Sequence, residues 1–64
     1  MDDHIRTLIL KAGEQALREH GFFGVSLRRI AQEVGVHPGT IGHHFGGKKG
    51  LMSAIELAAQ DRSR

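Results

Sequence analysis

The sequence contains no cysteine, and this excludes disulfide bonds, a thiolate nucleophile and a cysteine-based zinc site. Long apolar runs are also missing, since no stretch approaches the roughly 20 residues that a membrane-spanning helix needs. Asp2 and Asp3 stand where a signal peptide would carry positive charge. We therefore expect a soluble, unexported, cytoplasmic protein that makes no membrane contact and draws its stability from packing or from a partner.

Recognisable catalytic arrangements are absent as well. Gly42, Gly47 and Lys48 have the spacing of a phosphate-binding loop, but Lys49 replaces the Ser or Thr that such a loop uses for magnesium. The sequence has neither a G-x-S-x-G nucleophile motif nor a helical H-E-x-x-H zinc motif. A chain of 64 residues makes one small domain, which buries only about 60% of its surface. We predict a non-enzyme without a cofactor.

Apolar residues at helical spacing are the main feature that the sequence does contain. Between residues 3 and 20 they recur at steps of three and four, which places them on one side of a helix: Ile5, Leu8, Ile9, Ala12, Ala16 and Leu17. Gly21 suits the left-handed cap that ends such a helix. Phe22, Phe23 and Val25 follow in a short connection. Because exposed aromatic rings are costly there, we expect at least one ring in the core.

Three further helices are predicted along the chain. Ser26 can cap a short helix over residues 27–34, and Pro38 suits the first position of another over residues 38–45, which glycines then end. A last helix, over about residues 48–61, carries Leu51, Ile55, Ala58 and Ala59 inward. Its pattern is still running where the sequence stops. We expect residues 1–64 to be one module of a longer protein.

Two short helices joined by a turn at Gly35 describe a helix-turn-helix. The predicted fold class is therefore all-α, a small bundle of three to four helices that contains this motif, resembles a homeodomain and ends in a linker helix. The predicted core around the motif consists of Ile30, Ala31, Val36, Ile41, Phe45 and Leu51.

Positive charge is concentrated around the predicted motif. The formal net charge of the chain is +2, with −1 over residues 1–25, +3 over residues 26–50 and zero over residues 51–64. Such an excess favours a polyanionic partner. We expect phosphate contacts from Ser26, Arg28, His44 and Lys48, whereas Arg29 and Lys49 contribute to the field alone.

The helix over residues 38–45 carries the candidate reading face. If Ile41 and Phe45 point inward, Gly39 and His43 lie on the opposite face, with Thr40, Gly42 and His44 on its flanks. Such a slim helix fits the major groove, where each base pair has its own pattern of donors and acceptors. We expect base contacts from Thr40 and His43, close backbone approach at Gly39 and an apolar contact from Pro38.

The stretch from about Ile9 to Leu51 resembles the DNA-binding domain of TetR-type transcriptional repressors. The resemblance rests on residues at fixed offsets without a gap: Ile9, Leu10, Ala12, Leu17, Glu19, Gly21, Phe22, Ser26, Arg28, Ile30, Ala31, Gly35, Val36, Gly39, Thr40, Ile41, Phe45, Lys48 and Leu51. His37 replaces the usual Ser that opens the recognition helix, and Gly42 and His44 replace two tyrosines.

The resemblance implies a sequence-specific, nucleoid-associated regulator, a repressor, that binds double-stranded DNA. Such proteins dimerise on a palindromic operator through a larger helical C-terminal region, which also binds a small effector. That region is not in this sequence. We therefore expect a homodimer only together with it, and no effector is assignable.

Several alternatives stand beside this interpretation. Paired lysines or arginines often form only a solvated face, Thr40 can bond back to its own helix, and Ser26 can be a cap alone. The same apolar stripes also suit a small protein-interaction module without specific DNA binding, whose binding would resist salt.

The five histidines suggest a metal site, but no pair has the i, i+4 spacing of helical zinc ligands, so we predict none. Histidine side chains ordinarily gain charge near pH 6.5. The hypothesis is that DNA affinity changes between pH 8 and pH 6, and flat affinity over that interval would reject it.

Overall fold

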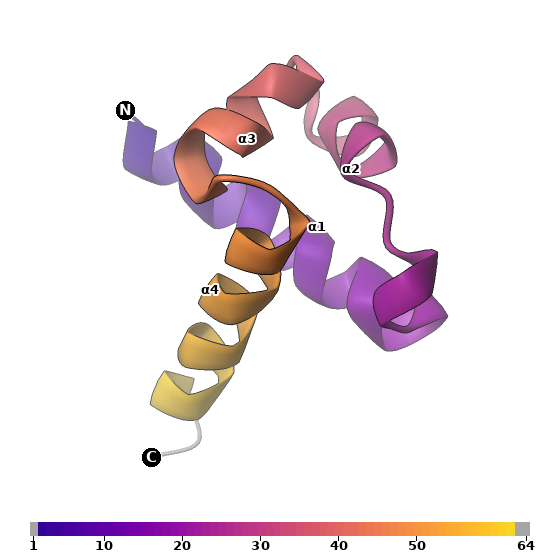
Figure 1. Ribbon diagram of the computed structural model, residues 1–64. Coiled ribbons are helices and arrows are strands. Elements are labelled where there is room, and N and C mark those ends of the chain that lie inside the picture. Colours follow the sequence, from indigo (N-terminus) through magenta and orange to yellow (C-terminus); the bar gives the residue numbers. More distant parts are fainter. Residues whose placement is uncertain (1, 63–64) are drawn as a thin grey trace.

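The computed structural model describes residues 2–62 as four α-helices and one 3-10 helix (Figure 1): α1 (Asp2–His20), η1 (Phe22–Gly24), α2 (Leu27–Val34), α3 (Pro38–Phe45) and α4 (Lys48–Arg62). The described chain contains no strand. The predicted all-α fold with a helix-turn-helix is therefore confirmed, with α2 and α3 as the paired helices. Met1, Ser63 and Arg64 of the predicted domain lie outside the described residues. Within residues 2–62, no helix combines the length and the apolar character needed to cross a bilayer.

The short helices end where the backbone turns left-handed. Gly35 after α2 has φ 89° and ψ 31°, and Gly46 after α3 has φ 79° and ψ 2°. Their amides donate to the carbonyls of Ala31 (2.8 Å) and Gly42 (2.7 Å), which satisfies groups that a helix end leaves without partners. At the start of α2, the Ser26 hydroxyl accepts a hydrogen bond from the Arg29 amide at 3.3 Å. These caps fix the lengths of α2 and α3 at two turns each.

One fully buried side chain from each helix forms the centre of the core. Ile9 of α1, Ile41 of α3 and Leu51 of α4 have no exposed surface, and Ile30 of α2 is 1% exposed. Val25, Ala31 and Ile55 complete the buried set, while Val36 and Phe45 are half-buried and pack against it. Figure 1 shows α4 leading away from α2 and α3, so that its C-terminal end lies far from them.

The prediction that a phenylalanine ring of the first connection enters the core is wrong. Phe22 is 41% exposed and Phe23 is 95% exposed, whereas Val25 is 6% exposed and takes the core position. The two rings meet edge to face at 5.2 Å between centroids, and the Lys48 ammonium lies 4.6 Å from the Phe22 centroid. Phe22 thus has a cationic partner at the surface, which partly replaces burial.

The two long helices, α1 and α4, bury fewer of their apolar residues than the sequence pattern predicts. Leu8 of α1 is 36% exposed and Ala59 of α4 is exposed, although both were expected to face inward. In α4 the half-buried Met52 packs against the core, which the spacing did not predict. A helix buries only the arc that a neighbour covers, so residues at the edge of an apolar stripe stay in contact with water.

Glycines allow α4 to pass close to two other helices. A Cβ atom on Gly50 would overlap the carbonyl oxygen of Phe45 and lie 2.8 Å from its carbonyl carbon. A Cβ on Gly13 of α1 would lie 3.1 Å from Cδ1 of Ile55 and 3.4 Å from Cδ2 of Leu51. The backbone of α4 therefore fits against the end of α3 only because position 50 has no side chain.

Gly50→Ala should lower the free energy of unfolding by about 2 kcal/mol, because the added methyl group must displace backbone at the α3–α4 junction. Urea denaturation followed by circular dichroism measures this change. An unchanged midpoint would mean that the junction opens without cost, contrary to the packing described here.

Gly42→Ala is the matched control within α3. A Cβ at position 42 meets no atom within 4 Å, and the residue is exposed in the middle of the helix. The same chemical change should here raise the free energy of unfolding by about 0.5–1 kcal/mol, the gain in helix propensity. Denaturation under the same conditions tests this, and a loss of stability would contradict the open surroundings of position 42.

Candidate nucleic-acid interface

The outer face of α3 is exposed and carries little side-chain bulk. Pro38, Gly39, Gly42 and His43 are exposed, while Ile41 points into the core with no exposed surface. Thr40 and His44, on the flanks, are half-buried. Eight residues make a helix about 12 Å long, and an α-helix with its side chains is about 10–12 Å in diameter, which matches the width of the DNA major groove. The face offers one hydroxyl, two imidazoles and bare backbone as its contact groups.

The imidazole of His37 caps the first turn of α3. The Nδ1 atom of the ring accepts a hydrogen bond from the Gly39 amide at 2.9 Å. The backbone carbonyl of His37 accepts one from the Thr40 amide, also at 2.9 Å. Sequence reasoning recorded His37 only as a departure from the usual Ser and did not find this role. The signal was its position directly before Pro38, where the capping residue of the helix must stand.

Aromatic rings and a cation gather at the C-terminal end of α3. The ring centroids of His43 and His44 are 5.7 Å apart, and those of His44 and Phe45 are 6.3 Å apart. The Arg6 guanidinium of α1 lies 4.9 Å from the Phe45 centroid, a cation–π contact. Arg6 thus adds a positive charge beside the predicted phosphate ligand His44. Its position in a helix distant in sequence gave no signal for this placement.

The other predicted phosphate ligands lie at helix starts. Ser26 and Arg28 are exposed at the start of α2, and Lys48 is half-buried at the start of α4. The contact between Lys48 and Phe22 places the start of α4 beside η1. Phe22 precedes Ser26 by only four residues in the chain. The Ser26 oxygen accepts from the Arg29 amide, and its hydroxyl proton remains able to donate.

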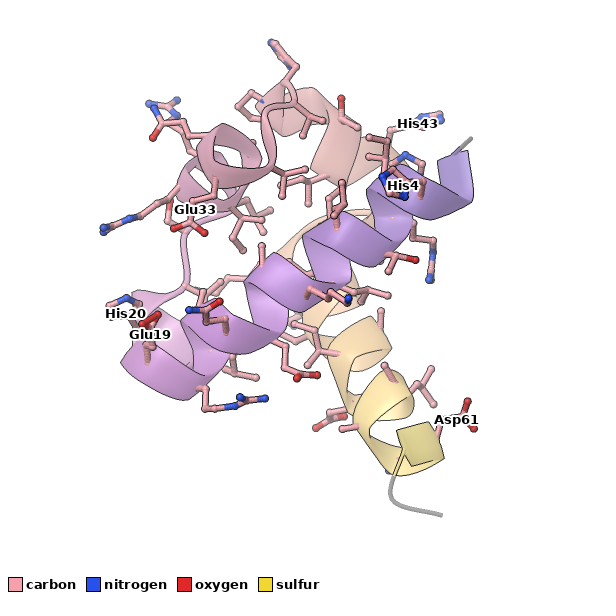
Figure 2. The ribbon with its side chains drawn as sticks, turned by 180° about the vertical axis from the view of Figure 1, so that it is seen from behind. His4, Glu19, His20, Glu33, His43 and Asp61 are labelled. Carbon is pink, nitrogen blue, oxygen red and sulfur yellow. The ribbon has the colours of Figure 1, made fainter. Side chains whose placement is uncertain are left out.

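The segment of the chain that contains α3 carries no negative side chain. No carboxylate side chain occurs between Glu33 and Glu56, a segment that includes all of α3 and the start of α4. Figure 2 shows Glu19 and Glu33 on the opposite side of the molecule from His43, and Asp61 at the far end of α4. Glu19 and Glu33 line a separate groove of about 410 Å³ between α1 and α2, together with Ser26 and Arg29. A polyanion approaching α3 would therefore meet only positive and neutral groups on α3 itself and on the start of α4.

The described histidines and carboxylates do not assemble into a metal site. Among residues 2–62, no three of them gather closely enough to hold a metal ion. In Figure 2 His20 lies at the end of α1 beside Glu19, far from His43 on α3.

The contact between Phe22 and Lys48 should be measurable as a coupling between two substitutions. We expect Phe22→Leu and Lys48→Met to be less destabilising together than the sum of the two separately, with a coupling of about 0.5–1 kcal/mol at this partly exposed site. Urea denaturation of the four chains gives the value. The cycle of Phe22→Leu with Lys49→Met is the control, and equal coupling in both cycles would reject a specific contact.

Comparison with known proteins places the chain among bacterial regulators. Residues 9–55 match the family described as "Bacterial regulatory proteins, tetR family". HTH-type transcriptional regulator UidR of Escherichia coli (strain K12) is 40% identical over 58 residues, which cover 91% of this chain and 30% of that protein. HTH-type transcriptional repressor AcnR of Corynebacterium glutamicum is 39% identical over 59 residues, covering 92% of this chain and 30% of that protein.

A third relative shows the same relation. HTH-type transcriptional regulator BetI 2 of Chromohalobacter salexigens is 43% identical over 49 residues, covering 77% of this chain and 24% of that protein. The chain thus spans less than a third of the length of these curated relatives. No solved structure matches it.

Proposed function

Because this chain belongs to the tetR family of bacterial regulatory proteins, we propose that it is a sequence-specific, DNA-binding transcriptional regulator that reads the major groove with α3. The observation that carries this proposal is the outer face of α3, which is exposed and carries little side-chain bulk. The chain also has no carboxylate between Glu33 and Glu56, a segment that includes all of α3. A helix of this kind can lie deep in the groove without electrostatic repulsion from the phosphates.

Base contacts are assigned to the exposed side of α3. Thr40 offers a hydroxyl and a methyl group, which suit a base edge and a thymine methyl. His43 is exposed on the same helix and offers a ring donor or acceptor. Pro38 and Gly39 are exposed at the helix start, where the absence of a side chain on Gly39 allows close backbone approach. None of these groups forms the bidentate fork of arginine, so each base contact is individually modest.

Phosphate contacts are assigned to groups that border this face. Arg28 at the start of α2 and Lys48 at the start of α4 supply charge, and Ser26 and His44 supply hydrogen bonds. Such contacts set the orientation of the domain on DNA and do not themselves read sequence. The Phe22 ring beneath the Lys48 ammonium restricts that side chain, which lowers the entropy lost when it binds.

The regulatory role follows from the relatives. One of them carries the word repressor in its name, and we propose repression for this chain too. Its place of action is the cytoplasm, on the nucleoid. Because the relatives are more than three times as long, we assign dimerisation on a palindromic operator to a longer protein that contains this domain.

Salt-dependent DNA binding tests the proposal. The chain should bind a random-sequence duplex in fluorescence anisotropy, and affinity should fall steeply between 50 and 200 mM salt because phosphate contacts release counterions. With the two cations Arg28 and Lys48 on phosphate in each monomer, a dimer should show a slope of about −3 to −4, and a monomer about half of that. The double substitution Arg28→Ala and Lys48→Ala should remove most of this binding.

Arg29→Ala with Lys49→Ala is the matched control, since it removes the same charge from neighbouring positions. Arg29 lines the groove that holds Glu19 and Glu33, so its loss should weaken binding much less. Circular dichroism of both variants verifies that they are folded. Equal losses in the two variants would show a diffuse field instead of the proposed contacts, and no binding at low salt would reject the proposal for this chain.

A protein-interaction module is the second candidate function. Leu57 of α4 is 67% exposed and lines a groove of about 550 Å³ between α1, α3 and α4, with Leu10, Ala54 and Ala58 also in its wall. Apolar docking there would bury carbon surface and would resist salt. Leu57→Ser distinguishes the candidates, because it should weaken such docking and leave DNA affinity unchanged.

A further inference from the structure

The His37 ring lies at the start of α3 and is not among the base or phosphate contacts proposed above. It is exposed, and its Nδ1 atom is occupied as the acceptor of the Gly39 amide. Its other nitrogen, Nε2, makes no hydrogen bond to any residue that the structure describes. We propose that Nε2–H of His37 donates a hydrogen bond to an acceptor atom on DNA. This inference rests on the proposed function.

The cap determines which nitrogen carries the proton. A neutral imidazole has one protonated and one unprotonated nitrogen, and only the unprotonated one accepts a hydrogen bond. Since Nδ1 accepts from the Gly39 amide, the proton of the neutral ring is on Nε2. A serine or threonine in this position would cap with its hydroxyl oxygen and would donate from that same atom, close to the helix backbone. The imidazole differs because it caps with one edge and presents a donor on the other.

Gly39 allows the ring to take this position. A Cβ atom at position 39 would lie 3.1 Å from Nδ1 of His37 and 3.5 Å from its Cε1 atom. The imidazole therefore lies close beside the Cβ direction of position 39, on the exposed start of α3, and a side chain there would have to shift the ring slightly. Pro38 and Gly39, the proposed base contacts nearest to it in sequence, belong to the same helix start.

Two kinds of acceptor atom on DNA can receive this hydrogen bond. A phosphate oxygen is the first, and a base acceptor in the major groove, which is N7 or O6 of guanine, N7 of adenine or O4 of thymine, is the second. A neutral N–H donor releases no counterion, so the contact changes affinity without changing the salt slope. This property separates His37 from Arg28 and Lys48.

The test replaces the single group in question. A 64-residue chain is short enough for chemical synthesis with 4-thiazolylalanine at position 37, which keeps the ring nitrogen that caps Gly39 and has sulfur in place of Nε2–H. We expect unchanged thermal unfolding, a DNA affinity about 3- to 10-fold lower and an unchanged salt slope. The comparison variant His37→Ala should lose both affinity and stability, because it also removes the cap.

Three results decide the matter. Equal DNA affinity of the thiazolyl chain and the unmodified chain would overturn the proposal and leave His37 as a cap alone. Nitrogen NMR of the unmodified chain without DNA gives an independent answer, since a proton on Nδ1 instead of Nε2 would overturn it as well. If the unmodified chain itself shows no salt-sensitive binding, the proposed function fails, and the inference fails with it.

Selection from a random duplex pool separates the two acceptor sources. A contact to a base acceptor predicts that the thiazolyl chain loses preference at one base position, whereas a contact to phosphate predicts the same preferred sequence with uniformly lower affinity. Either outcome supports donation from Nε2–H, provided that affinity has fallen.

Discussion

The meeting of four side chains, one from each α-helix, is the constraint on which the structure depends. Ile9, Ile30, Ile41 and Leu51 are all essentially without exposed surface, and each helix has only one such large side chain. In so small a domain the core cannot be moved without moving a helix. The orientation of α3 is therefore set from inside, by Ile41, and its outer face is free to carry contact groups that contribute nothing to packing.

Periodicity and glycine placement were enough to predict most of the fold. Gly35 and Gly46 have left-handed backbone, and Pro38 opens α3, so the ends of α2 and α3 follow from local chemistry that a sequence displays directly. The first connection was different. Val25 enters the core and Phe22 does not, a choice that depends on how the connection is oriented in the folded chain. The cation that contacts Phe22 is Lys48, 26 residues later in the chain, so the sequence around Phe22 does not reveal it.

The candidate site divides in the same way. The exposed face of α3 could be predicted from the inward positions of Ile41 and Phe45, because helix geometry relates the two faces. The position of the cap could be predicted as well, since residue 37 directly precedes Pro38, but its donor–acceptor chemistry could not, because it depends on the rotation of the His37 ring toward the Gly39 amide. The neighbourhood of Arg6 and Phe45 also depends on tertiary structure, because α1 crosses the end of α3 only after the chain has folded.

Gly42 gives the domain a surface position that can vary without disturbing its core. Its Cβ direction is open, and it lies on the face of α3 that the core does not use. Variation at this codon therefore adds or removes a contact group without any compensating change elsewhere in the chain. If α3 reads DNA as proposed, mutation and selection can explore new target sequences through this residue while the architecture of the domain is inherited intact.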